Sequence, residues 1–457
     1  MEKLTLLLLL ASIALASAKF PFYSTKPFIH KPAEDLGEPL LLTPFIQSSQ
    51  LEEVREAAEV DPDKFLGVRS YSGYFTVDEP NNGNLFFWFF PSASNYEEDP
   101  VLLWLQGGPG ASSLYGLFTE NGPFVVEDGE LGLRNYSWHK NFSLLYIDQP
   151  LGVGYSFTDG PLVSDQTQVG EHLYSALTQF FTVFSELRDN EFFISGESYA
   201  GKYVPAIGHT ILQNNDRADV RINLQGILIG NGLSDPKNQF NYGDLLYQLG
   251  LIDLATLEEA HTLESSIQEF IEEEDYESAT FIWNNMLQSL FYDPTGLMDI
   301  YNFVQDEDNS PSDWEEFIVQ NEIRQALHVG SQEYLSESYE VYYSLYEDIT
   351  KSVTDWVIEL LSHYRVLLYN GQLDIIVGYV LTENYVQKLQ YSAAEEYATA
   401  QREVWKVGDQ IAGYAKTAGN LTEVLVRNAG HMVPMDQPEF AYDLLMKFTK
   451  NKPIAGQ

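Results

Sequence analysis

Three side chains able to form a nucleophilic catalytic set stand far apart in the sequence, each shortly after an apolar run. They are Ser198 after the run at 192–194, Asp374 after the run at 366–369 and His431 after the run at 424–426. A serine hydroxyl is a weak nucleophile until a base accepts its proton. A histidine can be that base, and a carboxylate beside it fixes the imidazole tautomer and stabilises its cation. The set predicts acyl-transfer chemistry wherever the fold brings the three residues together.

Short, continuous apolar runs alternate with helical patterns over most of the chain. Expected strands cover residues 86–90, 101–105, 144–147, 192–194, 227–229, 366–369 and 424–426. Because strands buried on both faces lack polar alternation, this pattern predicts an α/β fold with a mostly parallel central sheet covered by helices on both sides. Open sheets of this kind build their sites at the carboxyl ends of strands, where all three candidates stand.

Ser198 has the surroundings of a sharp turn between a strand and a helix. Small residues flank it in Gly196-Glu197-Ser198-Tyr199-Ala200-Gly201, as a tight turn with closely approaching backbones requires. The pattern is that of the nucleophile elbow of α/β-hydrolases, with Ala200 where glycine is common. That class orders its triad as serine, acid, histidine, and the three candidates follow this order. Asp148 also follows an apolar run but precedes the serine, so we do not expect it to be the triad acid.

A glycine-rich loop, Gln106-Gly107-Gly108-Pro109-Gly110, follows the expected strand at 101–105. Glycines allow backbone N–H groups to approach a substrate closely, and an acyl-transfer site needs such donors for its oxyanion. We expect the backbone N–H groups of Gly108 and Tyr199 to form this oxyanion hole. The alternative is that the loop is only a tight turn.

The composition of the sequence differs between residues 236 and 325 from that of the rest of the chain. Residues 258–277 hold nine Asp and Glu and no Lys or Arg, yet apolar residues such as Ile267 and Phe270 recur among them. We expect acidic helices that form a lid at 236–325, inserted into one catalytic domain at 19–457. A solvated surface excursion without a function is the alternative.

The first residues have the composition of a secretory signal peptide. Met1-Glu2-Lys3 precedes an apolar run that ends in the small residues Ala16-Ser17-Ala18. We expect residues 1–18 to be removed and the mature protein to enter the secretory pathway, as a secreted or lysosomal protein. The later sequence has no run of about 18 apolar residues that would span a membrane. Acceptor sequences for N-glycosylation fit this route, at Asn135, Asn141 and Asn420.

The charge balance and the lack of cysteine exclude several functions. There are 67 Asp and Glu against 25 Lys and Arg, a formal net charge of −42. Such a surface repels nucleic acid and anionic membranes, and the repulsion within it is relieved in acid. The absence of cysteine excludes disulfides, thiolate metal sites and a cysteine nucleophile.

Five segments resemble the serine carboxypeptidase family, and within it the vitellogenic-like enzymes. They are GESYAGKYVPA (196–206), WLQGGPGASS (104–113), YIDQPLGVGYSF (146–157), YNGQLDIIV (369–377) and GHMVPMDQP (430–438). The resemblance runs over essentially the whole mature chain. It implies an α/β-hydrolase fold with an inserted helical lid and no metal or other cofactor. It also implies a carboxypeptidase that hydrolyses the C-terminal bond of peptides and proteins through an acyl-enzyme, best at acidic pH.

The resemblance assigns further residues to the terminal carboxylate of the substrate: Gln106, Glu120 and Glu197, with the backbone N–H of Gly107. Two acids that face a third carboxylate cannot all ionise cheaply, so we expect the pKa values of both to rise. In their protonated form they can donate hydrogen bonds to the substrate. Many relatives have Asn in place of Gln106, and relatives usually carry disulfides, which this chain lacks.

Other functions stay open from the sequence. An acyltransferase or lyase on the same scaffold would keep the triad but alter the groups that bind substrate, and the intact acid pair argues against it. A catalytically silent binding partner would have no need of Ser198 and His431 together. A peptide is the one partner that the resemblance implies, and a homodimer is left open.

Overall fold

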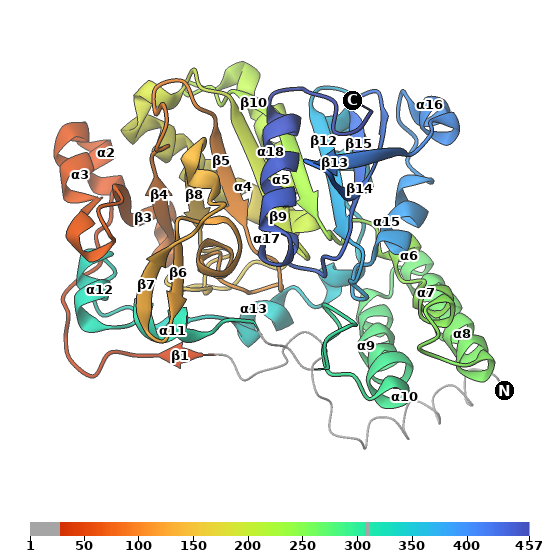
Figure 1. The fold of residues 1–457 in the computed structure, drawn as a ribbon. Helices are drawn as coiled ribbons and strands as arrows, with labels where there is room; N and C mark the ends of the chain where they lie inside the picture. Colours follow the sequence, from red (N-terminus) through yellow and green to blue (C-terminus); the bar gives the residue numbers. More distant parts are fainter. Residues whose placement is uncertain (1–27, 307–309, 457) are drawn as a thin grey trace.

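The apolar runs of the sequence become the central strands of an 11-stranded sheet (Figure 1). The computed structural model describes residues 28–306 and 310–456, so the signal peptide predicted at 1–18 lies outside the described residues. In spatial order the strands are β13 (Glu403–Val407), β14 (Gln410–Ala418), β15 (Leu421–Val426), β12 (Arg365–Gly371), β10 (Leu224–Gly230), β9 (Phe192–Glu197), β5 (Val101–Leu105), β8 (Ser143–Ile147), β4 (Gly83–Phe90), β3 (Ser70–Asp78) and β2 (Glu59–Val60).

The six strands at the centre of the sheet, from β15 to β8, run parallel to their neighbours. The pairs at both edges are antiparallel. The sheet is therefore mixed, with a parallel centre as the sequence predicts and antiparallel edges that it does not reveal. Antiparallel neighbours need only short turns, such as those that join β3 to β4 and β13 to β14. Parallel neighbours need long crossover connections, and the helices in those connections leave a periodic pattern of apolar residues in the sequence.

Helices cover both faces of the sheet, and the side chains of each central strand alternate between them. Leu103 and Leu105 pack in the core beneath α4 (Gln166–Val183), α5 (Ala200–Asn214) and α14 (Thr354–Leu361). Leu102 and Trp104 pack in the core beneath α17 (Val433–Asp436) and α18 (Pro438–Thr449). Burial of such a side chain contributes roughly 1.5–3 kcal/mol, which explains why β5 is apolar at every position and why the other central strands contain continuous apolar runs.

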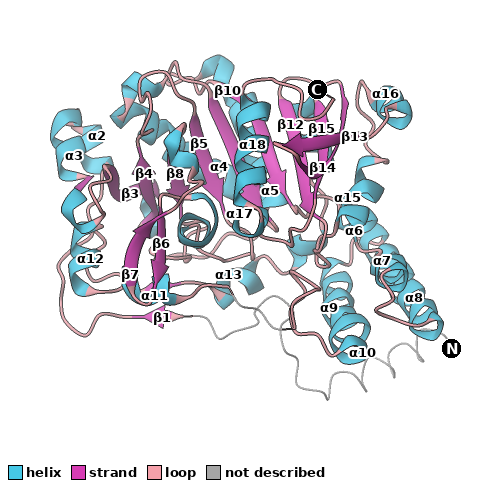
Figure 2. Ribbon diagram, viewed as in Figure 1, coloured by secondary structure: helices cyan, strands magenta, loops and turns pink. Residues whose placement is uncertain are grey.

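The segment between β10 and β12 is mostly helical and contains the region predicted as a lid. Besides α14, its α-helices are α6 (Pro236–Gln239), α7 (Tyr242–Gln248), α8 (Leu254–Glu272), α9 (Tyr276–Leu287), α10 (Asp293–Thr295), α11 (Asp313–Ile318), α12 (Asn321–Ala326) and α13 (Tyr339–Ser344). Helices α7 to α10 lie together at one end of the sheet (Figure 2). In α8 the apolar residues Leu257, Leu263 and Ile267 are buried, so this acidic segment packs as an amphipathic helix.

Smaller elements complete the described part of the chain. They are β1 (Ile29–His30), which pairs with β11 (Tyr334–Leu335), the hairpin β6 (Phe124–Glu127) and β7 (Glu130–Leu133), and the helices α2 (Thr43–Gln47), α3 (Leu51–Ala57), α15 (Tyr379–Val386) and α16 (Ala394–Thr399). Across residues 28–306 and 310–456, no helix has the length and apolarity needed to cross a bilayer.

Candidate active site

The turn after β9 holds Ser198 in a strained backbone conformation. Its φ angle is 65°, a left-handed value that costs a residue other than glycine of order 1–3 kcal/mol. The turn is braced by the strand beside it, because the Ser198 N–H donates to Gly230 O over 3.0 Å. The Leu233 N–H in turn donates to Ser198 O, also over 3.0 Å. Ser198 is thereby fixed at the carboxyl end of the sheet, between β9 and α5.

The small residues that flank Ser198 are required by the close approach of backbone segments. A Cβ on Gly196 would lie 2.7 Å from both Leu105 O and Ala200 Cβ. A Cβ on Gly201 would lie 2.6 Å from Leu233 N. Larger residues at these two positions would force the turn apart, whereas Ala200 fits where it stands.

His431 and Asp374 are hydrogen-bonded to each other and buried. The distance from His431 Nδ1 to Asp374 Oδ2 is 2.8 Å. Asn231 Nδ2 donates to the same carboxylate oxygen over 2.7 Å, and the Val377 N–H does so over 3.3 Å. A carboxylate held in this way keeps the proton of the imidazole on Nδ1 and leaves Nε2 as the basic nitrogen.

Ser198 and His431 line one pocket of about 300 Å³, and Gln106, Gly107 and Glu197 line it with them. Among residues 28–306 and 310–456, His431 Nε2 has no hydrogen-bond partner. This nitrogen is therefore able to accept a proton from a group in the pocket. Hydrogen bonds between nucleophile and base often tighten only when substrate is bound.

The glycine-rich loop after β5 lies directly against the turn at Ser198. A Cβ on Gly107 would be 2.6 Å from Tyr199 N and 2.7 Å from Ser198 Cβ. Gly108 has a φ of 110°, a conformation that favours glycine. Within the described part of the chain, the N–H groups of Gly108 and Tyr199 donate to no backbone acceptor. Two backbone donors are thus present beside Ser198.

Gln106, Glu120 and Glu197 are buried together next to the pocket. Gln106 Nε2 donates to Glu197 Oε1 over 3.1 Å, and Trp104 Nε1 donates to Gln106 Oε1 over 2.9 Å. Glu120, from the short π-helix Gly116–Asn121, lies within hydrogen-bonding reach of Glu197. Gln106 and Glu197 line the pocket, whereas Glu120 does not.

Burial raises the pKa of both carboxyl groups in this cluster. The pKa of Glu197 lies well above its ordinary value of 4.5, first because of burial and then because of the charge of Glu120. Burial raises the pKa of Glu120 to about 7, against the opposing effects of a hydrogen bond with Glu197 and the nearby His431. Two ionised carboxylates would leave their facing oxygens without a donor, whereas a shared proton supplies one. In mildly acidic solution the pair therefore retains a proton.

A buried ion pair beneath α5 is a feature that sequence reasoning missed. Lys202 Nζ lies 3.5 Å from Asp348 Oδ2 and donates to Asp348 O and, over 2.5 Å, to Lys351 O. The Tyr199 hydroxyl and Gln166 Nε2 both donate to Asp348 Oδ2. The pair therefore anchors the Tyr199 side chain, and no pattern around Lys202 in the sequence distinguishes it from a surface lysine.

Asp148 and Asn231 are two further residues at this edge of the sheet, and both brace the site. Asp148 Oδ1 accepts from Ser112 Oγ over 2.6 Å and from the Ser113 N–H over 3.0 Å, which holds the glycine-rich loop. Burial raises the pKa of Asp148 to about 6. Asp148 follows β8 and Asn231 follows β10. Their position after buried strands is the signal that could have assigned both to the site.

The predicted glycosylation residues lie in different surroundings. Asn135 is exposed. Asn141 is partly buried, with Nδ2 donating to Ser94 Oγ over 3.2 Å and Oδ1 accepting from the Tyr442 hydroxyl. Asn420 is exposed, and its Nδ2 donates to Leu361 O over 2.9 Å.

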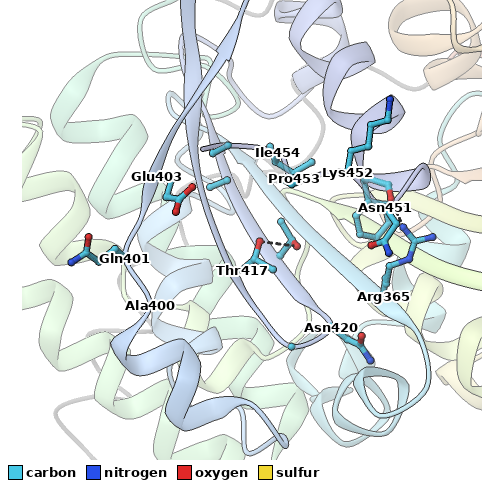
Figure 3. A pocket seen from close by; sticks show the side chains of 15 residues that line it. Arg365, Ala400, Gln401, Glu403, Thr417, Asn420, Asn451, Lys452, Pro453 and Ile454 are labelled. Atoms are coloured by element: carbon cyan, nitrogen blue, oxygen red, sulfur yellow. Dashed lines mark hydrogen bonds between the residues drawn. The ribbon is translucent and has the colours of Figure 1, made fainter. Parts of the chain in front are cut away.

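A second cavity, of about 520 Å³, lies where β12 and β15 begin, at the opposite end of these strands from Asp374 and His431 (Figure 3). Its lining includes Arg365, Glu403 and Asn420, and none of the residues with predicted catalytic roles. The Arg365 guanidinium donates to the carbonyl oxygens of Phe448 and Thr449. The smaller pocket at Ser198 is therefore the one with the chemistry of a reaction site.

Comparison with known proteins by sequence finds serine carboxypeptidases. The serine carboxypeptidase family matches residues 61–451. The chain is 46% identical to the venom serine carboxypeptidase of Apis mellifera, over 99% of this chain and 100% of the relative. It is 44% identical to the vitellogenic carboxypeptidase of Aedes aegypti and 41% identical to the probable serine carboxypeptidase CPVL of Homo sapiens, each over 92% of this chain and 91% of the relative.

A solved structure supports the same assignment. The prohormone-processing carboxypeptidase Kex1(delta)p of Saccharomyces cerevisiae superimposes with a TM-score of 0.78 at 26% identity, over 87% of this chain and 96% of that chain. The predicted α/β-hydrolase fold is confirmed, and so is the predicted activity, that of a serine-type carboxypeptidase acting on peptides. The chain belongs to the serine carboxypeptidase family.

Proposed function

We propose that Ser198, His431 and Asp374 form the catalytic triad of this carboxypeptidase. His431 Nε2 takes the proton of Ser198 Oγ as that oxygen attacks the last peptide carbonyl of the substrate. The imidazolium then gives this proton to the leaving amino acid, and Asp374 stabilises the cation. Water, activated by the same histidine, hydrolyses the acyl-enzyme and restores Ser198. The observation that carries the proposal is the 2.8 Å contact of His431 with Asp374 in a pocket that Ser198 also lines.

The backbone N–H groups of Gly108 and Tyr199 form the oxyanion hole in this proposal. The packing of Gly107 against Tyr199 N and Ser198 Cβ supports it, since it brings the two donors to the same atom of the substrate. A preorganised donor of this kind contributes a factor of about 10²–10³ to the rate.

In this proposal Gln106, Glu197 and the Gly107 N–H bind the C-terminal carboxylate of the substrate, and Glu120 takes part from behind Glu197 through the proton that the two share. This site restricts cleavage to the last bond. The raised pKa values of Glu120 and Glu197 support the role, because protonated carboxyl groups can donate to an anion. Raising the pH removes the shared proton and adds repulsion. We therefore expect the enzyme to work best in acid.

The protein follows the secretory pathway and is secreted or lysosomal in this proposal. Three observations support it: the sequence of residues 1–18, the acceptor sequences at Asn135, Asn141 and Asn420, and the similarity to a venom serine carboxypeptidase.

The helical segment at 236–325 acts as a lid within the catalytic domain at 19–457 in the same proposal. The position of α7 to α10 at one end of the sheet supports this role (Figure 2).

The test is release of the C-terminal amino acid from an N-blocked dipeptide between about pH 4 and 8. Release that is strongest in acid and lost in Ser198→Ala would support the triad and the protonated carboxylate site together. The same dipeptide with a C-terminal amide is the matched substrate that lacks the carboxylate. Equal release from both substrates would contradict the proposed carboxylate site, and release by Ser198→Ala would contradict the triad.

A further inference from the structure

Glu120 lies in a short π-helix, Gly116–Asn121, in which every residue is buried. Helices of this type are rare overall and frequent at functional sites. Glu120 does not line the pocket at Ser198, so its part in the acid pair depends on how the π-helix presents it to Glu197. The contacts that hold this helix in place therefore affect the binding of substrate.

Arg134 holds the backbone on both sides of Glu120. This residue directly follows β7, and its guanidinium donates to Phe118 O, two residues before Glu120. Arg134 Nε donates over 3.1 Å to Gly122 O, two residues after Glu120. The guanidinium also donates to Phe124 O over 3.0 Å. Carbonyl groups at the end of a helix need a donor from outside it, and one planar guanidinium can serve several of them at once.

The backbone and the charge of Arg134 both suit it to this task. Its own N–H donates to Pro123 O over 2.9 Å, so the main chain and the side chain of one residue bind the same turn. Arg134 is partly buried, and burial lowers the pKa of its guanidinium to about 10. The group therefore stays cationic in acidic and neutral solution.

The positive charge of Arg134 also acts on the acid pair of Glu120 and Glu197. The ionisable groups around this pair are His431, Asp374, Arg134, Tyr146 and Tyr369. Among these five groups, the guanidinium is the permanent cation. Burial raises the pKa of Glu120, and the charge of Arg134 is one of the effects that oppose this rise. Arg134 thus acts on both the position and the protonation of Glu120.

We propose that Arg134 positions Glu120 against Glu197 for substrate binding, by holding the backbone carbonyl groups on both sides of Glu120. Without the guanidinium these carbonyl groups lose a shared donor, and the π-helix is no longer fixed. Glu120 then shares its proton poorly with Glu197, the member of the pair that lines the pocket. This role rests on the proposed function of the carboxylate site. It predicts a loss of affinity for the terminal carboxylate rather than a loss in the reaction at Ser198.

The test compares Arg134→Met, which lacks both the charge and the donors, with Arg134→Lys, which keeps the charge without the planar fork. For an N-blocked dipeptide, Arg134→Met should raise KM about three- to tenfold, a part of what loss of a hydrogen bond to a charged group costs, with a smaller change in kcat. The same dipeptide with a C-terminal amide should show nearly unchanged kinetics. Arg134→Lys should recover part of the loss.

Arg188→Met is the matched control. Arg188 is also partly buried, and its Nε donates over 2.7 Å to Phe181 O, a backbone carbonyl of α4 away from the carboxylate site. Its replacement removes an arginine from a helix in the same way and should leave KM unchanged for both the free acid and the amide.

The pH profile of KM separates the role of Arg134 from a general loss of stability. Without the cation, burial acts on Glu120 with less opposition, so the acid pair keeps its proton to a higher pH. The pH at which KM rises for the free acid should therefore move upward in Arg134→Met and stay near the wild-type value in Arg134→Lys. A merely structural loss lowers activity without moving this pH.

An equal rise in KM for the free acid and the amide would overturn the proposal, and so would wild-type KM and an unmoved pH profile in Arg134→Met. Should Arg134→Met fail to fold, the acid and the amide are compared in Arg134→Lys, where a rise in KM confined to the acid supports the proposal and an equal rise contradicts it. Failure of the proposed carboxylate site is visible separately, as equal kinetics for the two substrates in the wild type. Calorimetric binding of both dipeptides to Ser198→Ala, with and without Arg134→Met, repeats the comparison without turnover.

Discussion

Gln106 Nε2 donates to Glu197 Oε1 over 3.1 Å, and this contact sets which polar atoms the pocket presents to a substrate. Trp104 Nε1 donates to the carbonyl oxygen of Gln106, so the orientation of the amide is fixed from behind. Asparagine, frequent in relatives at this position, is one methylene shorter. The longer glutamine side chain can therefore contact Trp104 and Glu197 at the same time.

Replacement of Gln106 tests this contact. Gln106→Leu removes the proposed donor to the terminal carboxylate and the hydrogen bond to Glu197 Oε1. Loss of a hydrogen bond to a charged group corresponds to about a tenfold or larger rise in KM for a dipeptide with a free carboxylate. Steady-state kinetics should show a smaller change in kcat. An equal rise in KM for the C-terminal amide would contradict a role in carboxylate binding.

The acid pair predicts a dependence of both activity and stability on pH. A carboxyl group whose pKa is higher in the folded chain binds more protons when folded. Its contribution to stability is present below the unfolded value near 4.5 and is lost as pH rises through the folded value, about 7 for Glu120. Both kcat/KM and the Tm should therefore fall between pH 5 and 8.

Glu197→Gln should weaken that pH dependence, because glutamine keeps a donor and cannot ionise. The measurement is kcat/KM and Tm across the same pH range, with Glu322→Gln on the exposed surface as the control. A Glu197→Gln profile that coincides with the wild-type profile would show that another group causes the loss at high pH.

Gly107 is the glycine whose replacement should harm catalysis most directly. A Cβ at this position would lie 2.6 Å from both Glu197 O and Tyr199 N, so Gly107→Ala must push the loop away from the turn. Displacement of an oxyanion donor lowers kcat by about 10²–10³-fold. Gly132→Ala is the control, since its nearest neighbour is the Val125 side chain at 3.2 Å. Near-normal kcat in a folded Gly107→Ala enzyme would contradict the oxyanion role of this loop.

The Lys202–Asp348 pair predicts a large loss of stability when one partner is removed. Asp348→Ala leaves a fully buried ammonium without its counter-ion, which costs about 3–5 kcal/mol in the free energy of unfolding. Unfolding in denaturant measures this loss of stability. Glu322→Ala, in the exposed Lys64–Glu322 pair, is the control and should hardly change the denaturant concentration at the midpoint of unfolding. If both variants lowered the free energy of unfolding by a similar small amount, the Lys202 ammonium would not depend on Asp348 for its stabilisation.

Much of the fold could be predicted from the sequence because burial on both faces leaves continuous apolar runs. The strands at 101–105, 192–194 and 366–369 correspond to β5, β9 and β12, with only their ends displaced. Of the antiparallel strands, β4 was predicted at 86–90, whereas β2, β3, β13 and β14 were not. Strands such as β13 and β14 have one exposed face and lack a continuous apolar run, as the exposed Val404 and Ile411 show.

The residues of the candidate site also divide into those that could be predicted from the sequence and those that could not. Ser198, Asp374 and His431 could be chosen from the sequence because chemistry and chain order restrict such residues to few positions. Lys202 and Asp348 could not, because a buried ion pair depends on two segments about 150 residues apart that no local pattern links. Asn231 lies between these cases, since its place after β10 is visible but its hydrogen bond to Asp374 is not.

Labelling with a fluorophosphonate, followed by peptide mass spectrometry, tests the catalytic role of Ser198 most directly. Such a reagent reacts with a serine only where a base and an oxyanion hole activate the hydroxyl. We predict one adduct per chain, on Ser198, with amino-acid release lost in proportion to labelling and no adduct in His431→Ala. Labelling of a different residue, or full release from a chain labelled at Ser198, would contradict the account.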